Sequence, residues 1–563
     1  MKTDSPVPAF LKKNHLCPIC AAKRLAAAFR VNIAGADRFD NGAALTPPMG
    51  WASWNLFRHN VNEEIIKSTA EALKKTGLAD LGYRYVNIDD CWMASVRDTD
   101  GKLRADEATF PSGIKKLVED VNSFGLSVGL YTSNGTFTCE GLPSSLYHER
   151  TDAETFADWG IEYFKYDFCH NEAIPTNAPE IEKLTVRLTD GSDAVYYAHE
   201  AQLRGAAEVF EDGALTDSGK YVGGLSSNAG AIIFDNITVP VSGVYTVTVG
   251  FRKTGKYEKF ADLTFNGTDR YSMRLPSATG GREGRYQLDV KLNKGANTLM
   301  INNPIASRAD SAARQYRDMG KELMRAAENK AARTGEPVKP ICYSICEWGI
   351  NRPWKWGYTA GNLWRTTTDI RPEWLSIVGI YEVNVRLYAH AGKGNWNDPD
   401  MLEVGNGKLN DDENRAHFSL WCMMAAPLIL GCDIRKFIKD DGTVDRNNSV
   451  YKIISNAEAI AIDQDPLGVQ CRRIKTNGRT DVLVKPLENG EAAVCLFNKT
   501  GKRAEAGFSI KELTKESYID LPDAEGYEVR NIWQKTDFIS TDRITEAVEP
   551  HSVILYRIKA AKK

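Results

Sequence analysis

The sequence has little that would hold a metal, a nucleic acid or a membrane. Its eight histidines are dispersed and no glycine-rich phosphate loop occurs, so neither a catalytic metal nor a nucleotide is expected. The formal net charge of -3 provides no basic surface for nucleic acid. The most apolar stretch, residues 418–432, contains a proline and is shorter than the roughly 20 residues that a membrane-spanning helix needs. We therefore expect an ordinary globular protein without nucleic-acid or membrane partners.

A regular disulfide framework is also absent. The eleven cysteines are an odd number and are scattered along the chain, so most are expected to be reduced. Cys17 and Cys20 form a single CPIC pair, which is more typical of an N-terminal leader, here residues 1–40, than of a zinc site. Lys23 and Arg24 cut the apolar run after this pair to about half of a usual signal-peptide core. These features favour a cytoplasmic location, with a secreted or periplasmic one as the alternative.

Between Pro48 and Cys432 short β-rich runs alternate with helical patterns. Eight such runs occur, namely MGWASWN, YRYVNIDD, LSVGLYTSN, IEYFKYDFC, PICYSICEW, LWRTTTDI, GNWNDPD and APLILGC. Alternating strands and helices predict a parallel sheet, and eight repeats predict an α/β fold of the (β/α)8 TIM-barrel type. We expect the barrel in two parts, residues 41–183 and residues 307–468.

The barrel pattern is interrupted once, after the fourth strand. Residues 184–306 are strand upon strand with Ser-Gly, Asn-Gly and Lys-Gly turn signals, which predicts an inserted β-sandwich. Loops that follow barrel strands open on the catalytic face, so we expect the insert beside the mouth of the active site. Alternating segments after residue 468 predict a second, antiparallel β-domain over residues 469–563.

The predicted ends of four barrel strands carry acidic side chains. They are Asp89 and Asp90, Asp167 beside Lys165, Asp369 near Arg365, and Asp398 with Asp400. A single acid there often only caps the next helix, but active sites of barrels form at these ends, and four such ends together predict a site. Tryptophans lie close to them in sequence, namely Trp51, Trp54, Trp92 and Trp348. Acidic side chains beside aromatic rings are typical of a sugar-binding site. The simplest catalytic group for such a site is a pair of carboxylates.

Six blocks of sequence carry a family resemblance. In this order they are LTPPMGWASWN, YVNIDDCW, FKYDFC, YSICEWG, WRTTTDI and GNWNDPDMLEVGNG. They resemble the signature blocks of glycoside hydrolase family 27, the α-galactosidases, over about residues 45–468 apart from the insertion. The resemblance implies retaining exo-hydrolysis of terminal α-D-galactosyl residues from glycans, with no cofactor required. The alternatives are a related specificity, α-N-acetylgalactosaminidase or β-L-arabinopyranosidase, and a sugar-binding protein without catalysis.

By the same resemblance Asp167 is the nucleophile and Asp369 the general acid/base. A retaining enzyme needs two such carboxyls about 5 Å apart, one ionised and one protonated. Lys165 lies two residues before Asp167 on an extended strand, so it should point to the same side and favour the carboxylate form. The acid should instead lie in a less solvated place, where its pKa rises once Asp167 is negative.

The resemblance also implies a set of substrate contacts. Asp89 and Asp90 accept hydrogen bonds from O4 and O6 of galactose, and Lys165 reaches O3 and O4. Trp51 forms the wall behind the sugar. The remaining members are Arg365, Cys346 and Trp348 around the 2-hydroxyl, together with Met401. A cysteine and a tryptophan beside the 2-hydroxyl leave little room for an acetamido group, which favours the galactosidase branch.

The sequence departs from the family pattern at one cysteine. His59 stands where many relatives have a cysteine able to pair with Cys91, so Cys91 is expected to be free. Cys139 and Cys169 match another paired position and are expected to bond only where conditions are oxidising.

The insert resembles carbohydrate-binding modules of family 35. Those modules often hold calcium through a glutamate of the first strand, but His199 and Glu200 shift that pattern, so calcium stays an open alternative. The expected partners are α-galactoside-containing glycans. The natural glycan and homo-oligomer formation are left open.

Overall fold

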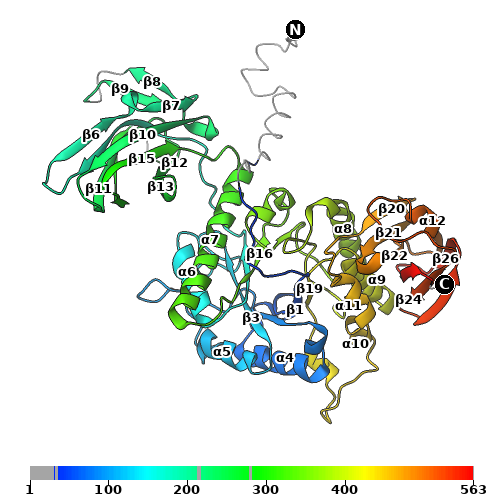
Figure 1. Cartoon of the computed structure of the whole chain (residues 1–563). Helices are drawn as coiled ribbons and strands as arrows, with labels where there is room; N and C mark the ends of the chain where they lie inside the picture. The colour runs from blue at the N-terminus through cyan, green and yellow to red at the C-terminus, as the bar shows by residue number, and fades with distance from the viewer. Residues whose placement is uncertain (1–30, 32–35, 212–216, 278–281, 562–563) are drawn as a thin grey trace, which may run out of the picture. The chain divides into compact units, whose positions relative to one another are not determined.

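The computed structural model describes residue 31 and residues 36–211, 217–277 and 282–561. Most of the predicted leader, with Cys17 and Cys20, lies outside the described residues. The chain forms two compact units, one containing residues 173–314 and the other containing residues 35–172 and 315–563 (Figure 1). Within the described ranges, no helix combines the length and apolar character needed to cross a membrane.

Eight parallel strands form the barrel of the larger unit. Their order around the sheet is β18-β17-β16-β4-β3-β2-β1-β19. The bounds are β1 (Met49–Ala52), β2 (Tyr85–Asn87), β3 (Ser127–Ser133), β4 (Tyr163–Asp167), β16 (Cys342–Cys346), β17 (Leu363–Arg365), β18 (Trp396–Asp398) and β19 (Leu428–Leu430). Leu402, four residues beyond β18, pairs in parallel with Leu430 and closes the ring. The predicted TIM barrel is therefore confirmed, and each of the eight β-rich runs contains one strand.

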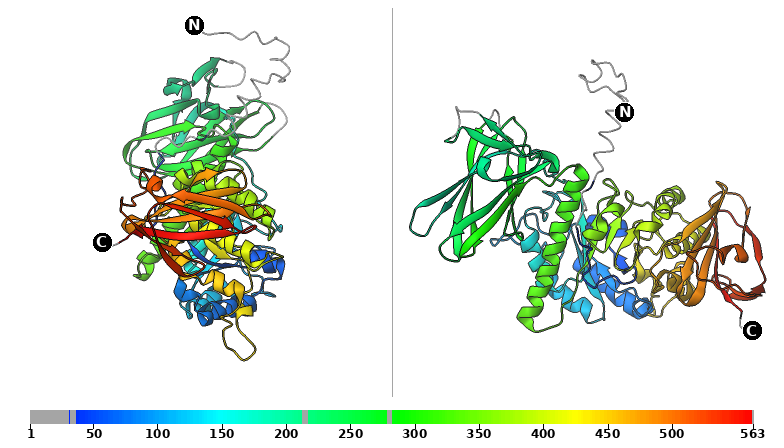
Figure 2. Two further views of the ribbon diagram at one scale, coloured as in Figure 1. Left: turned by 90° about the vertical axis from the view of Figure 1, so that its right-hand side faces the viewer. Right: turned by 45° about the horizontal axis from the view of Figure 1, so that its top comes forward.

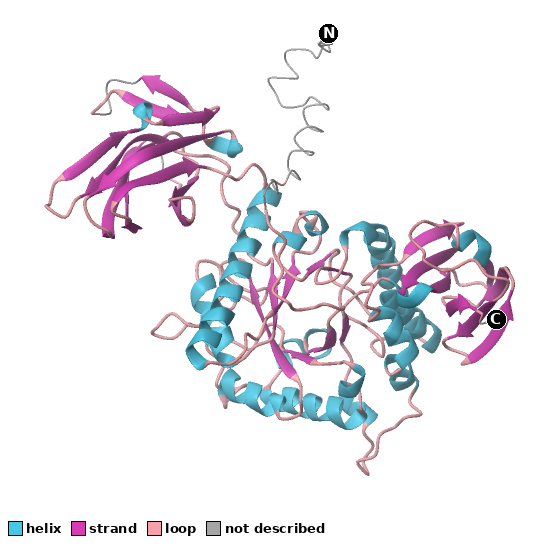
Figure 3. Cartoon of the chain, viewed as in Figure 1, coloured by secondary structure: helices cyan, strands magenta, loops and turns pink. Residues whose placement is uncertain are grey.

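Helices surround these strands, as Figure 3 shows. They are α3 (Trp54–Phe57), α4 (Glu63–Thr76), α5 (Gly113–Asn122), α6 (Glu149–Trp159), α7 (Arg308–Thr334), α8 (Trp374–Asn384), α9 (Asp411–Met423), α10 (Ser449–Ile454) and α11 (Ala457–Asp463). Local sequence fixes their ends. The Asn62 side chain accepts the Ile65 N–H at the start of α4, and Gly77 ends this helix with a φ of 82°. Asn410 and Glu413 form a capping box at the start of α9.

The inserted unit is a β-sandwich between β4 and α7, as predicted. One sheet has the order β13-β12-β15-β10-β7, and the other has the order β14-β11-β5-β9-β8, with β6 on β5. The bounds are β5 (Glu180–Arg187), β6 (Asp193–Tyr197), β7 (Gln202–Gly205), β8 (Glu208–Glu211), β9 (Lys220–Gly223), β10 (Gly230–Val239), β11 (Gly243–Lys253), β12 (Lys259–Phe265), β13 (Asp269–Leu275), β14 (Arg282–Leu292) and β15 (Gly295–Asn302). Figure 2 shows the two sheets face to face. Buried apolar side chains from both sheets form one core between them.

The first strand of the insert begins before the predicted boundary at residue 184. β5 starts at Glu180, and its pairing with β11 shifts register so that Ile181 and Lys183 oppose successive residues. The extra residue, Glu182, is a β-bulge, which breaks the alternation of apolar and polar residues. This bulge explains why the sequence pattern does not reveal the start of the strand.

The C-terminal domain has two antiparallel sheets. The larger has the order β20-β21-β22-β27-β24-β25, and the smaller pairs β23 with β26. The bounds are β20 (Arg472–Thr476), β21 (Thr480–Leu487), β22 (Glu491–Asn498), β23 (Ala504–Ser509), α12 (Ile510–Leu513), β24 (Tyr527–Asn531), β25 (Thr536–Ser540), β26 (Arg543–Val548) and β27 (Val553–Ala560). Helix α9 of the barrel packs on β21, β22 and β27 of this domain. The predicted C-terminal β-domain is confirmed.

Candidate active site

Asp167 is the last residue of β4 and lies at the C-terminal end of the barrel. Its backbone carbonyl accepts hydrogen bonds from the Asn134 N–H (2.8 Å) and from the Tyr316 hydroxyl (3.2 Å). Its carboxylate accepts the N–H of Phe168 at 2.8 Å. Two neighbouring segments therefore fix the backbone of this residue, and the next residue of the chain fixes its carboxyl.

Lys165 points to the same side of β4 as Asp167, as the alternation of a strand requires. Its Nζ lies 2.8 Å from Oδ2 of Asp89 and 3.9 Å from Oδ2 of Asp167. The same ammonium lies 5.1 Å from the centre of the Tyr131 ring, which is buried in β3. Tyr131 is a site residue that the sequence argument missed, although its parity in β3 matches that of the inward-facing Gly129 and Ser133.

The pKa of Asp167 is raised to about 6. Burial is the largest cause, and the charges of Asp89 and Asp369 add to it. Lys165 and the Phe168 N–H act in the opposite direction but do not outweigh burial. The predicted effect of Lys165 is present, yet the ligand-free carboxyl holds its proton more tightly than an ordinary aspartic acid.

Asp369 follows β17 and is held by Arg365 at the end of that strand. One guanidinium nitrogen of Arg365 lies 2.9 Å from Oδ1 of Asp369 and 2.8 Å from Oδ2 of Asp400. The Asp400 carboxylate also accepts the N–H of Ile370 at 2.8 Å. Asp400 therefore anchors both the arginine and the backbone next to Asp369, a role that the strand-end pattern did not assign.

The side chain of Asp369 is 70% exposed, which differs from the less solvated place that the sequence argument required. Partial desolvation would raise the pKa of this carboxyl, but the Arg365 guanidinium, with help from Lys165, lowers it below its ordinary value. In the ligand-free structure the two carboxyls therefore have the opposite pKa order to the one predicted.

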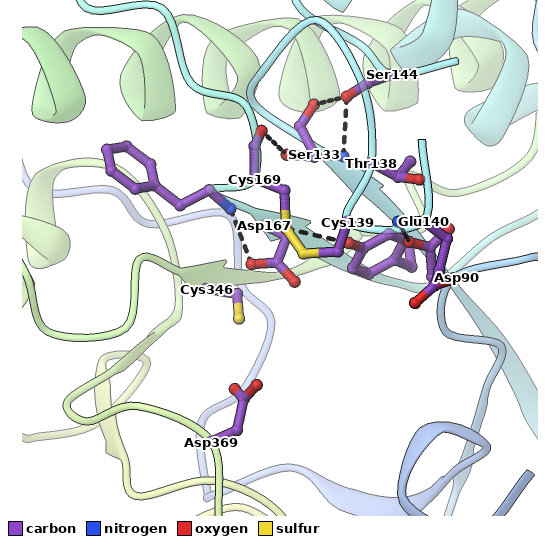
Figure 4. Close-up of a disulfide and its surroundings, with 12 residues drawn as sticks. Asp90, Ser133, Thr138, Cys139, Glu140, Ser144, Asp167, Cys169, Cys346 and Asp369 are labelled. Carbon is purple, nitrogen blue, oxygen red and sulfur yellow. Dashed lines mark hydrogen bonds between the residues drawn. A yellow bond between two sulfur atoms is a disulfide. The ribbon is translucent and has the colours of Figure 1, made fainter. Parts of the chain in front are cut away.

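Figure 4 shows the carboxyl groups of Asp167 and Asp369 turned toward each other, with Cys346 to one side. Cys346 ends β16, next to Asp167 in the sheet, and its Sγ lies 3.6 Å from an Arg365 nitrogen. Each predicted reacting carboxyl thus has its own cation, and the thiol of Cys346 lies beside both strand ends.

A disulfide joins Cys139 to Cys169 at this site. A carboxylate oxygen of Asp167 and the two sulfur atoms all lie within 4.8 Å of one another (Figure 4). The same loop contributes the N–H of Glu140 to Oδ2 of Asp90 at 3.1 Å. The loop around Cys139 therefore links Asp90 to the segment that follows Asp167. Cys91 is a free thiol, as predicted.

Four of the predicted substrate contacts line a cavity of about 40 Å³ in the barrel, namely Asp89, Lys165, Arg365 and Met401. Asp398 and Asp400 line it as well, and burial raises the pKa of Asp398 to about 6.

The two predicted tryptophans lie differently. Trp51 has no exposed surface and donates its indole N–H to the Cys432 carbonyl at 2.8 Å, so it lies behind the first layer of the site. Trp348 is partly exposed, has a φ of 55°, and its ring meets that of Phe168 edge-on at 6.2 Å. The Phe168 ring, which directly follows Asp167 in the chain, therefore lies beside Trp348.

Within the described ranges, side chains that could bind a metal ion come together at one place. Among the residues that the structure describes, the only group of three side chains of suitable type is Cys139, Asp167 and Cys169, in which the two sulfurs are bonded to each other. His199 and Glu200 belong to no such group among the described residues, and the calcium site stays a prediction.

The barrel brings two facing carboxyls, further acids, a lysine and an arginine together at its strand ends, which is the arrangement expected of the glycoside hydrolase class. The comparisons with known proteins narrow this class. Residues 46–207 and 283–465 match the family described as Alpha galactosidase A, and residues 477–558 match the Alpha galactosidase C-terminal beta sandwich domain. The chain belongs to this family, the α-galactosidases of glycoside hydrolase family 27, and it hydrolyses α-galactosides.

The similarity extends over nearly the whole chain. The chain is 32% identical to Alpha-galactosidase 3 of Arabidopsis thaliana, over 98% of this chain and 90% of that one. It is 29% identical to Alpha-galactosidase A of Cellvibrio japonicus, over 93% and 95% of the two chains. The crystal structure of alpha-galactosidase I from Mortierella vinacea superposes with a TM-score of 0.63 at 26% identity, over 93% of this chain and 100% of that one.

Proposed function

We propose that the chain is a retaining exo-α-galactosidase in which Asp167 is the nucleophile and Asp369 the general acid/base. The observation that carries this assignment is the pair of facing carboxyls at the ends of β4 and β17 (Figure 4). Each acid lies next to a cation, Lys165 or Arg365, which stabilises the negative charge that it carries during the reaction.

In the first step Asp167 attacks the anomeric carbon while Asp369 protonates the departing oxygen. A covalent β-galactosyl ester forms and the aglycone leaves. In the second step Asp369 takes a proton from water, the water displaces Asp167, and α-galactose is released. Asp167 is suited to attack because its backbone and carboxyl are fixed by Asn134, Tyr316 and Phe168.

The sugar itself is recognised by the polar residues below these acids. Asp89 and Asp90 accept hydrogen bonds from the 4- and 6-hydroxyls, and Lys165 donates to the 3- and 4-hydroxyls. Cys346, Arg365 and Trp348 surround the 2-hydroxyl, and Met401 completes the lining. Asp89 and Lys165 already contact each other at 2.8 Å, so galactose would enter a pair of groups that is oriented before binding.

Substitution of the nucleophile provides the test. Asp167→Ala should lose about 10⁴-fold or more in rate on an aryl α-galactoside, because no covalent intermediate can form. Added azide should restore turnover and give β-galactosyl azide, since it enters from the face that the carboxylate occupied. The matched variant Asp369→Ala should give the α-azide instead. If Asp167→Ala produced the α-anomer, the two roles would have to be exchanged.

A further inference from the structure

A second and larger cavity lies in the unit that contains the barrel and the C-terminal domain. Its volume is about 640 Å³, and it is lined by the start of α9, by residues between 446 and 457, and by the turn at residues 533–535. None of the residues proposed above for the reaction or for galactose recognition lines it. The cavity therefore requires an explanation of its own.

An aromatic ring in this cavity is held in place by hydrogen bonds. Trp533 is half-buried, and its indole N–H donates to Oγ of Ser419 at 2.9 Å. Its backbone N–H donates to Oδ1 of Asn531 at 3.2 Å. The Arg415 guanidinium lies 5.7 Å from the centre of the ring. A fixed aromatic ring next to hydrogen-bonding groups is what a sugar ring packs against.

The lining is rich in positive charge, although the chain as a whole has a formal charge of -3. The charged members are Arg415, Arg446, Lys452, Lys535 and the single acid Asp411. Two of the four cations are neutralised by acids outside the cavity, because Arg415 lies 2.7 Å from Asp412 and Lys535 lies 2.6 Å from Glu458. Arg446 and Lys452 form no ion pair with any described residue. They leave a local excess of positive charge that would attract an anion.

The hydroxyl-bearing groups complete this side of the cavity. One guanidinium nitrogen of Arg446 donates to the Tyr451 hydroxyl at 3.2 Å, so the arginine is oriented while its remaining N–H groups stay available. Ser449 and Ser455 line the same space and can exchange hydrogen bonds with sugar hydroxyls.

The cavity lies toward the catalytic end of the barrel. Helices α9 and α10 follow β18 and β19, and in a (β/α) barrel such helices begin at the end that carries the active site. Val450 lies between two lining residues and packs against Gly405 in the loop after β18. The contact is so close that a Cβ added to Gly405 would lie 2.8 Å from Cγ1 of Val450. That loop also carries Asp400 and Met401. Val450 therefore connects the start of α10, which lines the cavity, with the loop that carries Asp400 and Met401.

We propose that this cavity is a non-catalytic binding site for an acidic glycan. The ring of a uronic acid residue packs against Trp533, and its carboxylate pairs with Arg446 and Lys452. The site holds an acidic polysaccharide at the catalytic end of the barrel, which raises the local concentration of any galactosyl groups that the polysaccharide carries. This inference does not depend on which acid is the nucleophile.

Calorimetric titration of the full chain with a linear trigalacturonate tests the proposal. The matched ligand is the same trisaccharide with its carboxylates methyl-esterified, which keeps the rings and removes the charge. We expect measurable binding of the acid, weaker binding at higher salt, and a loss of about tenfold or more for the ester, because charge-assisted hydrogen bonds disappear.

Variants localise the binding. Trp533→Ala and Lys452→Gln should each weaken binding of the acid by about tenfold, whereas Lys115→Gln, an exposed lysine of α5 outside the cavity, should not. Lys452 is exposed, so its substitution tests the site even if Trp533→Ala folds poorly. All variants that fold should hydrolyse an aryl α-galactoside like the parent protein.

Four outcomes would overturn the proposal. Equal binding of acid and ester would indicate a neutral-sugar site. Binding that survives both cavity variants would place the ligand elsewhere. Competition by inorganic phosphate, together with indifference to Trp533→Ala, would indicate a simple anion site, and the absence of binding at millimolar ligand would remove the site altogether.

Discussion

Replacing Lys165 by methionine should move the pH profile of hydrolysis to higher pH. Methionine keeps most of the volume of the side chain and removes its charge. In the structure that charge lies 3.9 Å from Oδ2 of Asp167, and it lowers the pKa of both Asp167 and Asp369. Without this charge, both carboxyls should bind their protons more tightly. Each limb of the pH profile that reports one of these carboxyls should therefore shift to higher pH.

The size of the shift follows from this distance. Two unit charges at this separation interact by about 4 kcal/mol at an effective dielectric constant of about 20, which corresponds to roughly 3 pKa units. The Lys165 side chain is 22% exposed, so water reduces this figure. Opposite charges at such distances change measured pKa values by about 1–3 units, and we expect a shift in this range for the limb that reports Asp167.

The assay is the pH dependence of kcat/KM for an aryl α-galactoside, which reports the ionisations of the free enzyme and substrate. Lys165→Arg is the control, because it keeps the charge and should leave the limbs close to those of the parent protein. KM should rise in the methionine variant, since the hydrogen bonds to the sugar hydroxyls are lost. A folded methionine variant whose limbs stay in place, or move to lower pH, would refute the electrostatic reasoning.

Three further predictions follow from the same site. Asp369→Ala should lose about 10²-fold more activity on raffinose than on a nitrophenyl galactoside, because only the sugar leaving group needs protonation, and equal losses would contradict the acid role. The kcat/KM for an aryl α-N-acetylgalactosaminide should be about tenfold or more below that for the galactoside, because the acetamido group overlaps with Cys346 and Trp348 at a cost of about 1–3 kcal/mol. Comparable kcat/KM values for the two substrates would show that the 2-hydroxyl pocket is misassigned. A thiol reductant should lower wild-type kcat/KM by about 10–100-fold, because it releases the loop that holds Asp90. The reductant should not change kcat/KM of the Cys139→Ser variant, in which this value is already low. Equal sensitivity of both proteins would exclude the disulfide as the cause.

The fold could be predicted because its signals are local and repeated. Each barrel strand is a short apolar run, and several helices carry their own start and stop residues, such as Asn62 and Gly77 around α4. The insert was also visible as a change of period. Its first strand was not, because the bulge at Glu182 places two polar residues in succession and hides the alternation.

The site could be predicted only as far as strand parity and motif order reach. They placed Lys165 on the same side as Asp167, and the 3.9 Å contact between them agrees. They did not show that Asp400 and Arg365 together hold the segment of Asp369, since that contact joins two strand ends and the loops that follow them. Tyr131 was missed because strand parity places it on the inner face of β3 but does not separate a tyrosine of the site from one of the barrel core.

The order of the two pKa values was the least accessible property, because it depends on solvation in three dimensions. Asp167 is buried and keeps a raised pKa, whereas Asp369 is exposed and bound to Arg365, which lowers its pKa. The mechanism proposed above needs the reverse order, with an ionised Asp167 and a protonated Asp369. Galactose can restore the required order in two ways. Its ring displaces water from Asp369, which raises the pKa of that carboxyl, and positive charge that develops at the anomeric carbon favours the ionised form of Asp167. Part of the binding free energy is then used to set the protonation state, which couples recognition of the sugar to the first chemical step.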